Sequence, residues 1–382
     1  MKIVIVGTAY PMRGGIAQYN ALLYKYLSVN ENVVIYSFKR QYPEFLFPGK
    51  TQYEQGTPSV KIPEDKNKVT VDSINPFNWI INGFKISREK PDLIIYKYWL
   101  PFFGPCFFTI SFIAKLFSGA KVLFICDNVI PHEKRFGDRL FTKLAFSQAD
   151  YFLVMSKTVE EDLKIFSNDK PVKLLQHPVY NLFGEKVSKE DAKSAILEKY
   201  KVDIRNENVI LFFGYIRKYK GLKYLIDSLK KVLSVIKVKL LIVGEFYEDE
   251  KLYTDQIKNL NLENDVMIIS DFVPDENVKY FFSACDAVIL PYIDATQSGI
   301  TQIAYYYDKP VIATDVGGLS EVVINNFTGL VVKPESSEAI ADAVISFYKN
   351  NLEEIFSGNV MEEKKKYSWE NFTDEIMNLV NN

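Results

Sequence analysis

Cysteine and histidine are scarce in this chain of 382 residues. It contains three cysteines (Cys106, Cys126 and Cys285) and two histidines (His132 and His177). The cysteines are widely spaced and odd in number, so they match neither a disulfide framework nor a zinc-binding pattern, and a reducing cytoplasm is expected. Two histidines exclude a histidine-rich metal site.

Three further patterns are missing. No Asp-x-Asp motif occurs in a loop, so we expect no metal held in that way. No Gly-x-Gly-x-x-Gly follows the first strand, which disfavours a dinucleotide oxidoreductase. The chain begins with an apolar strand instead of a basic region and an apolar signal segment, which again predicts a cytoplasmic location.

The apolar stretch 99–118 is the segment that most resembles a membrane span. It contains Pro101, Gly104, Pro105 and Lys115, and its longest uncharged piece only approaches bilayer length. A buried helix is the preferred interpretation, and partial insertion into a membrane surface is the alternative.

Charge is divided unevenly along the chain. Residues 1–180 hold 23 Lys and Arg against 16 Asp and Glu, a balance of +7, and the remainder holds 23 against 32, a balance of −9. A basic first half indicates an anionic partner such as a membrane surface, and ordinary surface variation is the alternative.

Apolar runs of strand length alternate with amphipathic segments of helix length. Near-continuous hydrophobic runs such as 209–213 are typical of parallel strands covered on both faces. The alternation predicts an α/β protein with two doubly wound, Rossmann-like domains. The expected strands cover residues 2–6, 33–37, 93–96, 121–125, 151–154, 173–176, 209–213, 239–243, 266–269, 287–290, 311–313 and 330–332.

The expected domains are residues 1–180 and 205–360, and residues 361–382 form a helix that packs back on the first domain. Pro178 and a charged stretch mark the linker near 177–208. Residues 40–73, rich in Pro, Gly, Lys and Glu, are predicted to form a long loop.

Two distant loops carry the glycines and cations that bind phosphate. Residues 7–15 end in Gly14-Gly15 and follow the first strand, and residues 214–221 contain Arg217 and Lys220 and follow the strand 209–213. Backbone N–H groups at such a strand–helix junction attract anions. Since the second loop adds two cations, it is the preferred diphosphate site. A solvated basic turn is the alternative there, and a plain helix-start turn is the alternative at Gly14-Gly15.

Two late segments resemble a known family. Residues 309–323 (Lys-Pro-Val-Ile-Ala-Thr-Asp-Val-Gly-Gly-Leu-Ser-Glu-Val-Val) and 326–332 (Asn-Phe-Thr-Gly-Leu-Val-Val) closely resemble the donor-site motif of family 4 glycosyltransferases, also called glycosyl transferases group 1. The Gly14-Gly15 and Lys220-Gly221 pairs match that family in the expected places. The resemblance therefore covers nearly the whole chain.

The resemblance implies the GT-B architecture, in which two Rossmann-like domains face an interdomain cleft. It implies an enzyme that moves a sugar from a nucleotide-diphosphate sugar to an acceptor, with retention of configuration and without a metal or other cofactor. The first domain would bind the acceptor and the second the donor. Arg217 and Lys220 would neutralise the leaving diphosphate. The expected donor-binding residues are Gly14, Gly15, Gly214, Arg217, Lys220, Gly244, Asp294, Thr296, Gln297, Ser298, Gly299 and Glu321.

The donor loop departs from the family pattern. The family carries two glutamates eight positions apart, and here those positions hold Ala295 and Ile303. Glu321 is the leading substitute ligand for the ribose or sugar, and Asp294 is a second candidate. Loss of activity is a rival explanation.

The first domain departs as well. Related enzymes often place a histidine after the strand 121–125, where this chain has Cys126-Asp127-Asn128 followed by His132. Asp127 and His132 are the expected catalytic and acceptor-contacting residues, although His132 could instead cap the next helix. The remaining expected acceptor contacts are Asn128, Lys97, Tyr98 and Trp99, the two aromatic residues being equally compatible with the core.

These observations predict a glycosyltransferase of cell-surface polysaccharide synthesis that acts on a glycan or lipid-linked glycan, in the cytoplasm or peripherally on the inner face of the membrane, with no nucleic-acid partner. A catalytically silent nucleotide-sugar binding protein is the main rival. A sugar-nucleotide epimerase is a weaker one, since it would need more acid and base groups.

Overall fold

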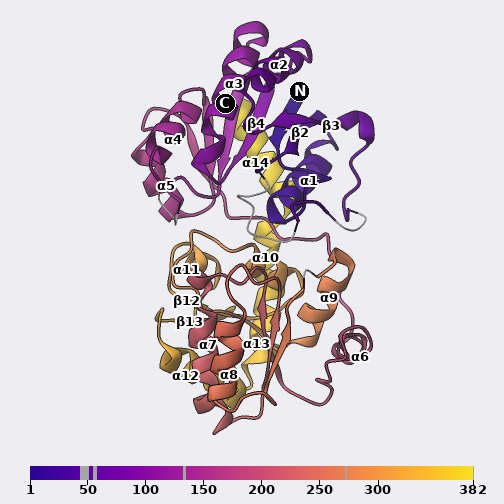
Figure 1. Ribbon diagram of the computed structural model, residues 1–382, viewed down its shortest axis with the longest axis vertical. Coiled ribbons are helices and arrows are strands. Elements are labelled where there is room, and N and C mark those ends of the chain that lie inside the picture. The colour runs from indigo at the N-terminus through magenta and orange to yellow at the C-terminus, as the bar shows by residue number, and fades with distance from the viewer. Residues whose placement is uncertain (44–50, 55–57, 132–134, 272, 382) are drawn as a thin grey trace. The chain divides into compact units, whose positions relative to one another are not determined.

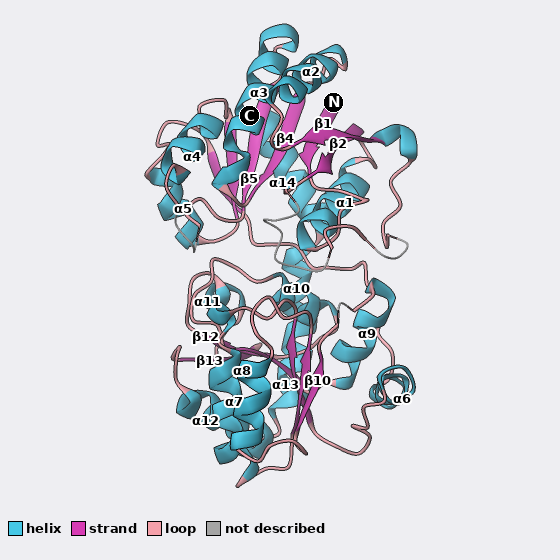
Figure 2. Cartoon of the chain, in the orientation of Figure 1, coloured by secondary structure: helices cyan, strands magenta, loops and turns pink. Residues whose placement is uncertain are grey.

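The computed structural model describes residues 1–43, 51–54, 58–131, 135–271 and 273–381. The chain forms two compact units, Met1–Gln176 with Ser368–Asn382, and His177–Tyr367 (Figure 1). Each unit has its own parallel sheet and its own core. Figure 2 shows helices flanking each sheet.

The first unit contains a seven-stranded parallel sheet in the order β3-β2-β1-β4-β5-β6-β7. Its central strands form because runs such as Leu-Ile-Ile-Tyr are apolar on both faces, as burial between two helix layers requires. The strands are β1 (Lys2–Gly7), β2 (Asn32–Arg40), β3 (Asn67–Asp72), β4 (Leu93–Tyr98), β5 (Lys121–Cys126), β6 (Tyr151–Val154) and β7 (Val172–Leu174).

Helices cover both faces of this sheet. Residues of α2, α3, α4 and α5 join one core cluster with one face of the central strands. α1 and α14 pack together through Tyr19 and Trp369, whose ring centroids are 5.1 Å apart. The helices are α1 (Gly15–Leu27), α2 (Pro76–Arg88), α3 (Gly104–Ser118), α4 (Asp138–Phe146), α5 (Lys157–Lys164) and α14 (Trp369–Asn381).

The apolar stretch around α3 packs as a core helix. Among the described residues, the segment Pro101–Ser118 alone is long and apolar enough to cross a membrane by length and composition, with a mean hydropathy of 1.3. Part of it is buried, and its residues Phe107, Ile110 and Ala114 belong to the core of the first unit. The inner face of α3 thus packs against the sheet.

The second unit contains a six-stranded parallel sheet in the order β10-β9-β8-β11-β12-β13. α7, α8 and α12 share one core cluster with one face of it. The strands are β8 (Val209–Phe213), β9 (Lys239–Val243), β10 (Val266–Ile269), β11 (Ala287–Leu290), β12 (Val311–Thr314) and β13 (Gly329–Val332). The helices are α6 (Lys189–Tyr200), α7 (Leu222–Leu233), α8 (Lys251–Asn259), α9 (Asp275–Ala284), α10 (Gly299–Tyr306), α11 (Leu319–Val322), α12 (Ser337–Lys349) and α13 (Leu352–Glu363).

Two sequence expectations about local structure are wrong. The expected loop 40–73 contains the edge strand β3, which pairs in parallel with β2. The expected linker 177–208 contains α6, which packs on α9 and is tied to the second unit by an ion pair of 2.6 Å between Lys189 Nζ and Asp286 Oδ1. The two units divide at residues 176/177 and 367/368, and the last segment, Ser368–Asn382, belongs to the first unit.

Candidate functional site

Ten of the twelve residues expected to bind a donor, all except Gly14 and Gly15, lie in the second unit. Gly214 directly follows β8, Gly244 follows β9, and the loop 294–298 follows β11. All strands of this sheet are parallel, so these carboxyl ends meet at the same edge. β8 lies between β9 and β11, where the strand order reverses, and open α/β sheets bind ligands at this point.

Lys220 is a buried cation at this edge. Its side chain is 8% exposed, and its ammonium lies 3.1 Å from where a Cβ on Gly214 would stand. Burial, reinforced by the neighbouring Arg217 guanidinium, lowers the pKa of Lys220 to about 7. Among the described residues, no carboxylate contributes to that pKa, so this charge lacks the counter-ion that a buried ammonium ordinarily has.

Arg217 is held beside Lys220 by aromatic packing. Its guanidinium carbon lies 4.9 Å from the centroid of the Tyr247 ring, and that ring packs on Tyr215 at 4.6 Å. The short 3-10 helix Lys218–Lys220 directly follows Arg217, and the Lys220 N–H donates to the Arg217 carbonyl at 2.9 Å. The turn therefore presents two like charges a short distance apart, an arrangement that a diphosphate would relieve.

The glycines of this edge allow backbone segments to approach one another closely. Gly214 and Gly244 have φ values of 102° and 142°, and a Cβ on Gly244 would stand 2.2 Å from the Gly214 carbonyl oxygen. Gly317 has a φ of 49°, and a Cβ there would stand 1.6 Å from the Ala295 carbonyl oxygen. A side chain at Gly244 or Gly317 would collide with backbone, so the Gly244 turn packs closely on the Gly214 turn and the Gly317 turn packs closely on the loop after β11.

The loop after β11 leads into the start of α10. Ser298 caps this helix, because its Oγ accepts from the Ile300 N–H at 3.2 Å. The Thr296 carbonyl accepts from the Gly318 N–H at 3.0 Å, which joins this loop to the turn before α11. Glu321 lies half-buried on α11, so the structure places it in the element that follows this turn.

The two positions at which the sequence departs from the family pattern are buried. Ala295 is 4% exposed and Ile303 is 6% exposed. These are the positions at which the family pattern has glutamates, and a carboxylate buried there would need a partner. At both positions this chain has a buried apolar side chain where the family pattern has an acid.

A buried ion pair connects two strand ends in the first unit. Lys97 Nζ, at the end of β4, lies 2.7 Å from Asp127 Oδ1, just after β5, and their side chains are 1% and 9% exposed. The ammonium also lies 3.4 Å from the centroid of the Tyr19 ring on α1. Burial lowers the pKa of Lys97, and the Asp127 charge opposes that shift. Sequence reasoning treated Lys97 and Asp127 as separate acceptor contacts, whereas the structure makes them one unit in which Lys97 positions Asp127.

The other expected acceptor residues have different surroundings. Tyr98 is fully buried and its hydroxyl donates to Thr142 Oγ1 at 2.9 Å, so its role as a sugar-stacking surface is wrong. Trp99 is half-buried, and its indole N–H donates to the Tyr42 hydroxyl at 3.1 Å. Asn128 is half-buried beside Asp127, and His132 lies outside the described residues.

Gly14 and Gly15 lie at the corresponding edge of the first sheet. α1 begins at Gly15, and Gly14 precedes it with a φ of 98°. β1, which leads into this loop, is paired with β4, whose end carries Lys97. The first loop is thus on the same sheet edge as the Lys97–Asp127 pair.

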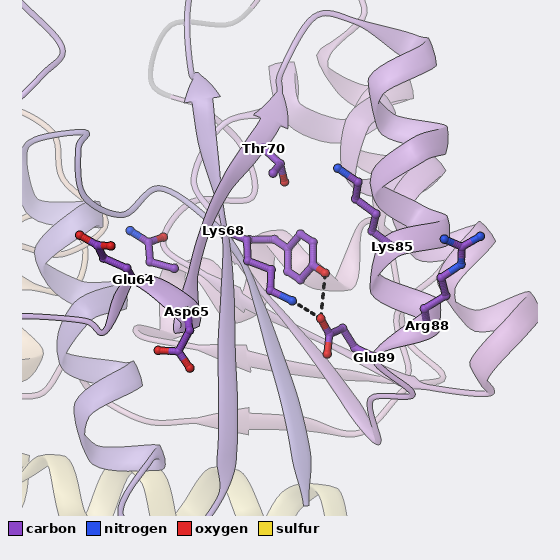
Figure 3. A pocket seen from close by; sticks show the side chains of 9 residues that line it. Glu64, Asp65, Lys68, Thr70, Lys85, Arg88 and Glu89 are labelled. Atoms are coloured by element: carbon purple, nitrogen blue, oxygen red, sulfur yellow. Dashed lines mark hydrogen bonds and ion pairs between the residues drawn. The ribbon is translucent and has the colours of Figure 1, made fainter.

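An open polar pocket of the first unit contains none of the expected site residues (Figure 3). It lies beside β3 and the end of α2, and Lys68 and Glu89 point toward one another across it. Burial raises the pKa of Glu89, but hydrogen bonds from Lys2 and Lys68 outweigh it and lower the pKa to about 2. Glu89 therefore stays ionised, and its charge is already paired with Lys2 and Lys68. The lining residues are Tyr36, Glu64, Asp65, Asn67, Lys68, Thr70, Lys85, Arg88 and Glu89.

Comparison with known proteins identifies the class. Residues 197–367 match the family model described as glycosyl transferases group 1. The uncharacterized glycosyltransferase MJ1069 of Methanocaldococcus jannaschii is 24% identical, covering 99% of this chain and 97% of that protein. The lipopolysaccharide 1,2-N-acetylglucosaminetransferase of Salmonella typhimurium is 27% identical, over 46% of this chain and 48% of that enzyme. Several other curated relatives likewise match over only about half of their length.

Solved structures show the same architecture. The structure of Anabaena HepE in complex with UDP and glucose has a TM-score of 0.76 at 18% identity, covering 100% of this chain and 99% of that one. Residues 197–367 thus match the group 1 glycosyltransferases, and the chain has the GT-B fold, with a parallel α/β sheet in each of its two units. The predictions of family, fold class and enzyme class are confirmed.

Proposed function

We propose that this enzyme transfers a sugar from a nucleotide-diphosphate sugar to a glycan or lipid-linked glycan during cell-surface polysaccharide synthesis. The single observation that carries the donor assignment is the buried Lys220 ammonium beside Arg217, without a carboxylate acting on it among the described residues. Anabaena HepE, which shares the fold, forms a complex with UDP and glucose, and this supports a nucleotide sugar as the class of donor.

In the proposed reaction, the bond between the sugar C1 and the diphosphate oxygen breaks while the acceptor hydroxyl oxygen forms a bond to C1 on the same face. The acceptor proton passes to the departing diphosphate. The Lys220 and Arg217 cations stabilise the negative charge that grows on the diphosphate, so the chemistry needs no metal. Transfer on the same face retains the configuration at C1.

The acceptor is proposed to be presented at an anionic membrane surface on the cytoplasmic side. The name of the Salmonella relative, a lipopolysaccharide-modifying enzyme, supports a cell-surface glycan. The +7 balance of residues 1–180 supports an anionic surface. The aromatic run 99–112 is weaker support for a membrane surface than the sequence alone indicates, because its residues Phe103 and Phe107 belong to the core.

A thermal-shift screen across UDP-, GDP-, ADP- and dTDP-sugars tests the donor assignment. A specific ligand at a hundredfold excess over its Kd stabilises the folded state by about 2.7 kcal/mol. Stabilisation by one nucleotide class, lost in the Arg217→Ala and Lys220→Ala variants, is the expected result. No shift with any nucleotide sugar would contradict the proposal.

Two further measurements test the finer claims. Activity should persist in EDTA, and restoration of a lost activity by magnesium or manganese would contradict the metal-free mechanism. The anomeric configuration of the product, measured by NMR before it equilibrates, should match that of the donor.

A further inference from the structure

The outer face of α2 in the first unit carries large apolar side chains. Phe77, Ile81 and Phe84 are 80%, 52% and 42% exposed. Their spacing of i, i+4 and i+7 places them along one stripe of the helix. The opposite stripe, which includes Ile86, is buried against the sheet.

α3 continues this apolar surface. Its Phe112, Leu116 and Phe117 are 49%, 65% and 60% exposed. The Phe84 and Phe117 rings lie 5.1 Å apart, so the exposed residues of the two helices are in contact. We call Phe77, Ile81, Phe84, Phe112, Leu116 and Phe117 the apolar patch. Monomeric proteins rarely leave such a contiguous patch uncovered without a use for it.

The helices that carry this patch are basic. α2, α3 and α4 together contain five Lys and Arg and one acid, Asp138. Asp138 Oδ2 already accepts from the Arg135 backbone N–H at 2.6 Å. Lys85 and Arg88 are exposed on α2, Arg88 on the same stripe as Phe84.

Like α2, α4 has exposed apolar and basic side chains. It packs beside α3, and residues of both helices join the same core cluster on one face of the sheet. Leu140 is 64% exposed, and Arg139 and Lys143 are exposed near it on the outer side. Exposed apolar groups and cations are thus combined on three helices of one layer.

We infer that the apolar patch docks on an anionic bilayer, with its apolar side chains in the headgroup region and Lys85, Arg88, Arg139 and Lys143 against the lipid phosphates. This combination is the one that binds membrane interfaces. A second copy of the chain fits the patch less well, because pairing two such faces would bring like charges together. The buried inner face of α3 keeps that helix in the core, so the surface lies on the membrane and does not cross it.

The α3 residues of the patch lie away from the start of that helix. This helix follows β4 and begins at the sheet edge where Asp127 lies, whereas Phe112, Leu116 and Phe117 lie in its second half. Docking through the patch would hold the first unit at the bilayer that carries a lipid-linked acceptor. The inference rests on the proposed function only for the lipid-linked nature of that acceptor.

Vesicle flotation at low salt tests the inference. The full chain should float with vesicles of phosphatidylglycerol and phosphatidylcholine, bind pure phosphatidylcholine vesicles at least tenfold more weakly, and dissociate as salt increases. The Phe77→Ser/Leu116→Ser double variant should lose at least tenfold in partitioning, and Lys85→Gln/Arg88→Gln should lose the preference for anionic lipid. The matched control is Leu252→Ser/Ile355→Ser, which replaces side chains 62% and 57% exposed in the second unit and should float like the wild type.

Three outcomes would overturn the inference. The first is failure of the wild type to bind anionic vesicles, and the second is binding by Phe77→Ser/Leu116→Ser that equals binding by the wild type. The third is a dimer, detected by light scattering, that this variant abolishes, because such a dimer would assign the patch to a second copy of the chain. The nucleotide thermal shift, measured on the same samples, keeps the two proposals apart. A lost flotation with an intact nucleotide shift refutes the docking surface alone, whereas an absent nucleotide shift refutes the donor assignment and leaves the flotation result standing.

Discussion

Replacing the buried Lys220 with methionine should stabilise the ligand-free protein and abolish donor binding. Burial and the Arg217 charge lower the pKa of Lys220 from its ordinary value of 10.5 to about 7. At about 1.4 kcal/mol for each pKa unit, the buried ammonium destabilises the folded state below pH 7 by at most about 5 kcal/mol. The Lys220→Met variant keeps the apolar stem and removes this charge, so its free energy of unfolding should exceed that of the wild type by several kcal/mol at pH 6.

The same pKa predicts a pH dependence with a definite sign. Between pH 7 and about 10.5 the unfolded chain holds a proton on Lys220 that the folded chain lacks, so the free energy of unfolding of the wild type should rise with pH in that window. This rise should be absent in Lys220→Met. Urea unfolding at pH 6, 7 and 9 measures it, with and without a nucleotide sugar.

The neighbouring Lys218 provides the matched control, because it belongs to the same 3-10 turn and is exposed. Lys218→Met should leave the stability, its pH dependence and the nucleotide shift unchanged. The reasoning is refuted if Lys220→Met is no more stable than the wild type at pH 6 and is still stabilised by nucleotide sugars.

Three further predictions concern other parts of the chain. Lys97→Met and Asp127→Asn should each cost about 3–5 kcal/mol in urea unfolding, because each leaves a buried charge or polar group without its partner. The double variant should cost less than their sum, and strict additivity would show that the pair is not coupled. Trp369→Ala should cost about 3–5 kcal/mol, since this side chain is 1% exposed, and a loss below about 1 kcal/mol would contradict its place in the core. Glu321→Gln should lower kcat/KM for the donor at least tenfold, whereas Ala295→Glu, which introduces an acid at a buried position, should not improve it; a large gain from Ala295→Glu would show that the loop keeps the family geometry.

The sheets could be predicted from the sequence because both are parallel and buried on both faces. Runs such as 209–213 are apolar throughout, and each ends in a loop of glycine and charge. The edge strand β3 was missed because four of the six residues in its sequence, Asn-Lys-Val-Thr-Val-Asp, are polar and because it lies in a region rich in Pro and Gly. Only pairing with β2 makes it a strand, and that pairing is a tertiary contact.

The site residues could be predicted where the sequence near them was sufficient, and they were missed where their role depends on tertiary contacts. The residue types at the strand ends predicted an anion site, because Arg217 and Lys220 directly follow a buried strand. The pairing of Lys97 with Asp127 depends on two strands lying side by side, although a lysine inside an apolar run such as 93–98 already indicates a buried partner. The apolar patch was missed because the spacing of Phe77, Ile81 and Phe84 is also that of a helix face buried in a core.

Release of nucleoside diphosphate from the nucleotide sugar that gives the largest thermal shift tests the central claim most directly. Without acceptor, the wild type should release it slowly to water, and Lys220→Met should reduce this rate by a factor on the order of 10² or more. Binding without any release, from every donor tested and with glycan acceptors present, would contradict the claim and identify a catalytically silent nucleotide-sugar binding protein.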